Sequence, residues 1–106
     1  MGYNDEIKEL QAWVDEAHQE LFYGGFSESK IREMFKLNPL KAKELYGSAL
    51  VETTQVCQEK GWQLKSIHDR YGAKAADAAL LDRIHKCNNE AIRLVNMLAK
   101  LCGYTG

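Results

Sequence analysis

The sequence predicts an all-α fold: a small helical bundle with an N-terminal helix-turn-helix and a long C-terminal helix or helical hairpin. Three observations favour this fold. Apolar residues recur at spacings of three and four, the period of a helix buried on one side. The glycine pair Gly24-Gly25 and the single proline, Pro39, fall between these periodic segments. A length of 106 residues with 45% hydrophobic content suits one compact core, so residues 1–106 are predicted to form one domain.

The first segment is predicted to be an amphipathic helix. Asn4 can cap it, and Asp5 and Glu6 in the first turn suit the positive end of the helix dipole. The helix should stop at Gly24-Gly25, because glycine commonly ends helices. The residues expected to face the core share a spacing of three or four: Ile7, Leu10, Trp13, Val14, Ala17 and Leu21.

The middle of the chain is predicted to hold three shorter helices. Ser27 can cap the first, which carries Ile31, Met34 and Phe35 inward. Asn38-Pro39 is a second start signal, a capping residue followed by proline at the first helical position. We expect this next helix to run towards Gln58 and to end before Gly61.

A further short helix is predicted from Trp62 to Tyr71, closed by Gly72. Its apolar side would include Trp62, Leu64, Ile67 and Tyr71. We interpret Trp62, like Trp13, as a core anchor and not as a platform for a ligand, because large aromatic side chains contribute most of their stabilisation when buried.

Residues 73–102 form the most regular segment and are predicted to be one long helix. Gly103 follows as a left-handed cap. A heptad seam of this length exceeds what short neighbouring helices cover, and each large aliphatic side chain left in water forgoes roughly 1.5 to 3 kcal/mol. Self-association is therefore expected, through a seam that comprises Leu80, Ile84, Ala91, Leu94, Leu98 and Leu101.

Two alternatives for this segment stay open. The seam could be covered within one chain, with the acidic first helix lying along it. Asn88 and Asn89 could also mark a break that folds the segment into a hairpin. Either arrangement would reduce the need for a second copy.

Residues 26–50 match the spacing of a helix-turn-helix. In a twenty-residue unit that starts at Glu28, two short helices crossing steeply must bury particular positions, and all of these are apolar here. They are Ile31, Phe35, Leu37, Ala42 and Leu45. Polar residues alternate with the buried ones on the second helix, as recognition of base edges and phosphates requires. We therefore expect binding to double-stranded DNA.

Charge is unevenly distributed, although the net charge is only -1. Residues 1–22 are acidic, with Lys8 as their only basic residue. This acidic helix could be a back turned away from DNA, or a face that binds a protein partner. The second possibility gives an alternative function: a small phage or mobile-element protein that inhibits a host protein through helical surfaces. The acids concerned are Asp5, Glu6, Glu9, Asp15, Glu16 and Glu20.

Residues 20–104 resemble phage small terminase subunits and related phage helix-turn-helix proteins. The resemblance rests on the stretch from Leu21 to Ser27, on Ile31, Ala42, Tyr46 and Ala49, and on the closing stretch from Ala91 to Tyr104. It implies a helix-turn-helix that binds the packaging site on viral DNA and a helical hairpin that assembles a ring. Carried over to this chain, the resemblance and the need to neutralise phosphates give six DNA-binding residues: Ser29, Lys30, Lys36, Asn38, Lys41 and Lys43.

Catalytic and metal-binding patterns are not recognisable. No Ser/His/Asp order, phosphate-cradling glycine loop or carboxylate pair with a partner base stands out, so we expect neither enzyme activity nor a cofactor. We interpret His85 with Glu90, and His68 with Asp69, as solvated neighbours. The histidines are scattered and no CxxC pair exists, so no metal site is predicted. The three cysteines, an odd number, are expected to be reduced core residues: Cys57, Cys87 and Cys102.

No membrane segment is predicted. The longest apolar runs fall far short of the roughly 20 residues that span a bilayer, and no basic-then-apolar leader is recognisable at the N-terminus. We therefore expect a cytoplasmic protein, in the host cytoplasm if the protein is viral.

Overall fold

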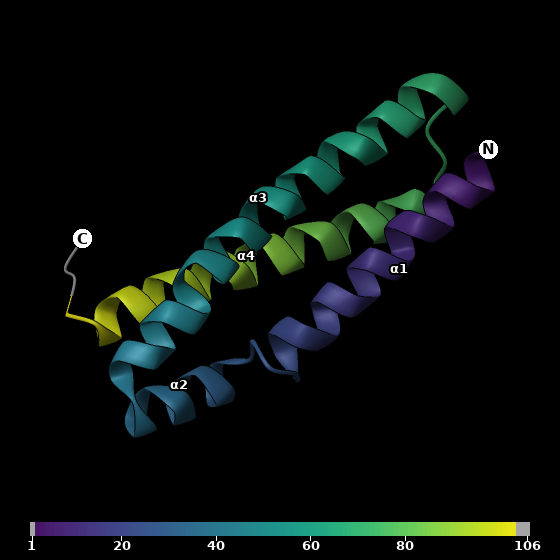
Figure 1. Ribbon diagram of the computed structural model, residues 1–106. Coiled ribbons are helices and arrows are strands. Elements are labelled where there is room, and N and C mark those ends of the chain that lie inside the picture. The colour runs from purple at the N-terminus through teal and green to yellow at the C-terminus, as the bar shows by residue number, and fades with distance from the viewer. Residues whose placement is uncertain (1, 104–106) are drawn as a thin grey trace.

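The computed structural model is all-α and describes residues 2–103. Four helices follow one another, α1 (Tyr3–Phe22), α2 (Glu28–Leu37), α3 (Pro39–Tyr71) and α4 (Asp77–Leu101), and no strand occurs in the described part (Figure 1). Tyr104, which closes the stretch that resembles the terminase subunits, lies outside the described residues. No helix in the described range is long and apolar enough to cross a membrane.

The two longest helices, α3 and α4, pack against each other along their length. They run in opposite directions, joined by a short loop, and α1 and α2 lie together on one side of the pair (Figure 1). α1 makes more extensive contact with α4 than with α3, and α2 contacts mainly α3. The bundle is therefore elongated, about 48 × 25 × 20 Å.

Four of the predicted helix boundaries are confirmed. The Asn38 side chain accepts a hydrogen bond from the Lys41 N–H at 3.1 Å, with Pro39 in the first turn of α3. The Gly24 N–H donates to the Gln19 carbonyl at 2.8 Å and closes α1. Gly72 and Gly103 have φ of +88° and +90°, a conformation that favours glycine.

Two residues predicted to cap helices, Asn4 and Ser27, do not do so with their side chains. α1 already includes Asn4, because it begins at Tyr3, and the capping position belongs to Gly2. Ser27 does occupy the position before α2, but its side chain caps no N–H group. Instead, its backbone carbonyl accepts a hydrogen bond from the Ile31 N–H at 3.0 Å. The first turn of α2 is therefore closed by the backbone.

The break predicted at Gly61 is wrong, because α3 is one unbroken helix of 33 residues that includes Gly61. A glycine in a helix interior costs roughly 1 kcal/mol relative to alanine. Cys57, Leu64 and Ile67 on both sides of Gly61 are buried in the one core. Burial of these side chains is worth more than the cost of the glycine, so the helix stays whole.

Trp62 is not a core anchor, since 69% of its surface is exposed. In an unbroken helix each residue turns by about 100°, so Trp62 lies nearly opposite Leu64, which is buried. Tyr71 is also exposed, by 39%. Trp13, by contrast, is half-buried and packs against the core. The prediction had placed Trp62 and Leu64 on one apolar side, although residues two apart lie on nearly opposite sides of a helix.

α4 is a single helix that includes Asn88 and Asn89, so the hairpin alternative is wrong. Its heptad seam is covered within the chain, by α3 and by α1 and α2 on the other side. The expectation that the seam would be left uncovered assumed short helices, whereas α3 is long enough to cover it. Of the residues predicted to self-associate, Leu80, Ile84, Ala91, Leu94 and Leu98 are buried and Leu101 is half-buried against the core.

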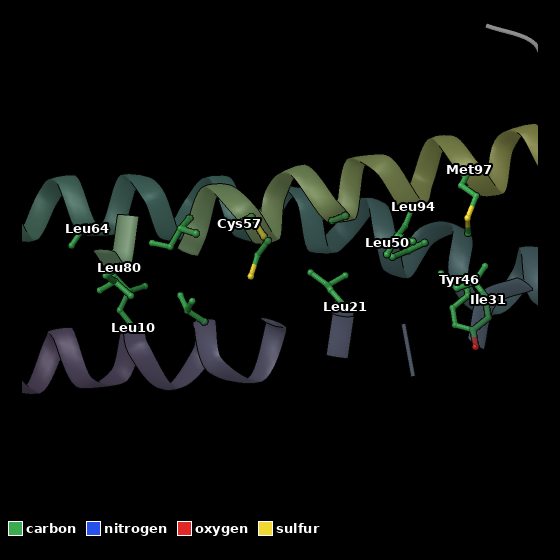
Figure 2. Close-up of a cluster of buried hydrophobic side chains, with 14 of the residues drawn as sticks. Leu10, Leu21, Ile31, Tyr46, Leu50, Cys57, Leu64, Leu80, Leu94 and Met97 are labelled. Atoms are coloured by element: carbon green, nitrogen blue, oxygen red, sulfur yellow. The ribbon is translucent and has the colours of Figure 1, made fainter. Parts of the chain in front are cut away.

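The core runs along the whole bundle. Figure 2 shows Leu10, Leu64 and Leu80 at one end of it and Ile31, Tyr46 and Met97 at the other. The cysteine prediction is confirmed for the two central positions: Cys57 and Cys87 are free and buried, whereas Cys102 is half-buried. Burial raises the pKa of the Cys57 thiol to about 11 and also raises that of Cys87.

Candidate nucleic-acid interface

The corner between α2 and α3, which comprises residues 27–46, is fixed from beneath by buried side chains. Ile31 and Ala42 are fully buried, one from each helix. The Phe26 ring packs edge-on against Tyr46, with 5.8 Å between the ring centroids. Only Asn38 separates the two helices, so the chain turns sharply there (Figure 1). The start of α3 is therefore held firmly against α2.

Two of the five positions predicted to be buried in a helix-turn-helix are exposed. Leu37 is 77% exposed and Leu45 is 50% exposed, so their predicted burial is wrong. The inward face of α3 is centred on Ala42 and Tyr46, and Leu45 lies about 100° from Tyr46. Leu37 ends α2 at the tip of the corner, where no other helix covers it. Phe35 is half-buried against the core.

The structure brings the six predicted DNA-binding residues into this one corner. All of them are exposed: Ser29, Lys30 and Lys36 on α2, Asn38 between the helices, and Lys41 and Lys43 on the first turns of α3. They do not form one flat face, because residues two apart lie on nearly opposite sides of a helix. Lys43 accordingly lines a hollow between α3 and α4, together with Gly47 and Val95.

An ion-pair network ties the start of α2 to α4. The Arg93 guanidinium donates to Glu28 at 2.6 Å and to Glu90 at 2.7 Å. Arg32 donates to Glu28 at 3.1 Å. Hydrogen bonds from Arg93 and then Arg32 lower the pKa of the Glu28 carboxyl. The two arginines therefore neutralise the charge of Glu28 locally. A paired carboxylate repels a phosphate at the corner less than an unpaired one would.

The outward face of α1 is acidic. Asp5, Glu9 and Glu16 are exposed and, among the described residues, pair with no cation. Glu6 and Asp15 instead bond Arg70 of α3 and Arg83 of α4. The acidic surface thus lies on α1, and the lysine-bearing corner lies at the α2 end of the bundle.

The end of the bundle away from α2 holds a polar cluster that the sequence reasoning missed. Asp77, only 4% exposed, accepts hydrogen bonds from the Tyr3 hydroxyl and from His68 Nε2, the latter at 2.8 Å. Burial first, and then the hydrogen bond to Asp77, raise the pKa of Tyr3 to about 12. The partner of His68 is therefore Asp77 and not its neighbour Asp69. Nothing in the sequence signals this pairing, which depends on the path of the loop between α3 and α4.

Arg70 and Glu6 extend this cluster on the surface. Arg70 donates to the Glu6 carboxylate at 2.7 Å and lies over the Tyr71 ring, 5.4 Å from its centroid. The hydrogen bond from Arg70 lowers the pKa of Glu6. The Tyr71 ring packs edge-on against Tyr3, 5.9 Å away. The arrangement joins three helices and leaves its charges paired with one another.

No group of three or more potential metal ligands comes together in the described part of the chain. No family model matches the sequence, and comparisons with curated proteins and with solved structures find no match either. The assignment of a function therefore depends on the chain's own residues and their arrangement.

Proposed function

We propose that this protein is a non-enzymatic DNA-binding protein, similar to phage small terminase subunits, that holds duplex DNA at the α2–α3 corner. The supporting observation is the grouping of exposed lysines around the amino end of α3. Lys36 and Lys41 flank that end, where the helix dipole places partial positive charge. Helix amino ends and lysines together favour phosphate oxygens.

Binding by one copy would be weak. Lys30, Lys36, Lys41 and Lys43 allow three or four phosphate contacts at most, and the net charge of -1 adds no general attraction. Useful affinity requires several copies on one DNA, since linked contacts raise the effective concentration. Light scattering of the protein with and without duplex should therefore show a larger complex, and not a one-to-one complex, when DNA is added.

The surface is tested by Lys41→Ala combined with Lys43→Ala, measured by fluorescence anisotropy with a labelled duplex in low salt. We expect the affinity to fall more than about tenfold, while circular dichroism stays unchanged because both side chains are exposed. Lys8→Ala with Lys86→Ala is the matched control. It removes the same charge from exposed positions outside the corner. Equal affinity of the Lys41/Lys43 variant and the wild type would reject this surface.

A second candidate function is inhibition of a host protein through the acidic face of α1. The unpaired carboxylates of Asp5, Glu9 and Glu16 favour it, because such a row would attract a basic partner or mimic the charge of DNA. Chromatography on immobilised duplex at low salt separates the two functions. A DNA-binding protein is retained and elutes with salt, whereas an acidic mimic flows through.

A further inference from the structure

The side of the α3–α4 pair that faces away from α1 and α2 is open and hollowed. On α3, Lys60 faces α1, because it lies over the Trp13 ring. Trp62 comes two residues later and therefore lies on nearly the opposite side of α3, away from α1. On α4, Arg83 faces α1, because it pairs with Asp15. Leu81 comes two residues before Arg83 and therefore lies on nearly the opposite side of α4. Two hollows of about 430 and 260 Å³ occupy this open side, and we name it the α3–α4 groove.

Both walls of the groove follow a heptad spacing. Alternating steps of four and three are what a helix presents to another helix packed along it. On α4 this second stripe lies beside the buried seam and comprises Leu81, His85, Asn88, Ile92, Val95, Ala99 and Cys102. On α3 the matching stripe comprises Gly47, Val51, Thr54, Gln58, Gly61 and Lys65. The α4 stripe spans roughly 30 Å, the length of a helix of about 20 residues.

The groove leaves apolar surface and space unfilled. Trp62, Val51 and Ile92 are exposed by 69%, 44% and 41%. A Cβ placed on Gly47 or Gly61 would meet no atom within 4 Å. Apolar side chains of a docking helix can therefore enter between the walls at both glycines. Exposed apolar side chains beside open hollows are typical of a surface that another molecule covers.

The polar groups of the groove define the chemistry of its occupant. The residues that line the two hollows include Lys43, Lys65 and His85, and among the described lining residues none is acidic.

We propose that the α3–α4 groove binds an amphipathic helix of a partner protein, with acidic residues flanking its apolar stripe and a tyrosine or tryptophan that fills the larger hollow. The ring would pack against Trp62 and Leu81, which line that hollow. Helices laid in apolar grooves and anchored by one aromatic residue are a common recognition mode.

A second copy of this chain is a poorer occupant. Two such grooves face to face would bring Lys43 and Lys65 of one copy against the same lysines of the other. The acidic outer face of α1 has the complementary charge, but around Asp5, Glu9 and Glu16 it lacks an apolar stripe to fill the groove. The charge pattern therefore favours a different protein.

A synthetic peptide of about 21 residues, three heptads with leucine at the core positions, glutamate at the flanks and one central tyrosine, serves as the probe. We expect it to bind the full chain by calorimetry. Replacing its glutamates with lysine should weaken binding at least about tenfold, and replacing its tyrosine with alanine, which empties the larger hollow, should also weaken it about tenfold. No binding at millimolar concentration, or equal binding of the lysine peptide, would overturn the proposal.

Matched variants locate the site. Ile92→Glu should weaken peptide binding at least about tenfold, whereas Leu40→Glu, at an exposed leucine outside the groove, should leave it within about twofold. Equal affinities of these two variants would contradict the proposal, as would a dimer in sedimentation that Ile92→Glu dissociates. Ile92→Glu leaves the corner lysines in place, so a loss of peptide binding in this variant says nothing against the proposed DNA surface, which is measured separately.

Discussion

The two ends of the bundle differ in how their charged side chains are paired. At the end that holds Tyr3 and Asp77, the polar side chains bond one another across α1, α3 and α4. At the α2–α3 corner, Lys36 and Lys41 are exposed at the amino end of α3 and no ion pair among the described residues involves them. Charges that pair within the chain fasten the helices together. Charges left in solvent contribute little to stability and remain available to a ligand.

Substitution of a buried residue beneath the corner should have the largest effect on the free energy of unfolding. Ile31→Ala removes a fully buried side chain beneath the lysines, and we expect the free energy of unfolding to fall by about 3 kcal/mol. Leu37→Ala, in the same helix but 77% exposed, should change it by less than about 0.5 kcal/mol. Urea denaturation followed by circular dichroism measures both, and similar losses would contradict the packing described for α2.

Substitution at the end that holds Tyr3 and Asp77 should have a somewhat smaller effect on the free energy of unfolding. Asp77→Ala leaves the Tyr3 hydroxyl and His68 without their buried acceptor, so we expect a loss of about 2 kcal/mol in the free energy of unfolding. Asp82→Ala is the control, since Asp82 pairs with Lys86 on the exposed side of the same helix. Its cost should stay below about 0.5 kcal/mol. An Asp77 variant as stable as the Asp82 variant would show that the cluster does not fasten the helices.

The Arg70–Glu6 pair should produce the smallest effect, visible in titration. Arg70 holds the pKa of Glu6 below its ordinary value of 4.5, so Arg70→Ala should raise this pKa towards that value in an NMR titration. A lowered folded-state pKa stabilises the protein above the ordinary pKa, and that contribution is lost as the pH falls through the folded-state pKa. Acid unfolding of the variant should therefore lose part of its pH dependence below about pH 4.5. An unchanged pKa of Glu6 would contradict the pair.

The sequence was sufficient to predict the elements that local chemistry determines. Asn38-Pro39 marks the start of α3, and Gly72 and Gly103 end their helices with positive φ. The prediction failed at Gly61, where packing along α4 outweighs a local preference, and at Trp62, which lies on nearly the opposite side of α3 from the buried Leu64. The six residues predicted to bind DNA lie in one corner because they are close in sequence, and their contact with DNA stays a prediction. The Tyr3–Asp77–His68 cluster was missed because its members come from three different helices.

Phosphate contact by the corner lysines is the central claim, and the salt dependence of duplex binding tests it most directly. Each neutralised phosphate adds about -0.9 to the slope of log K against log salt concentration, so three or four contacts predict a slope of about -3. Lys36→Ala should make it less steep by about 1, whereas Lys8→Ala should leave it unchanged. A flat slope for the wild type, or the same slope for Lys36→Ala, would contradict DNA binding at this corner.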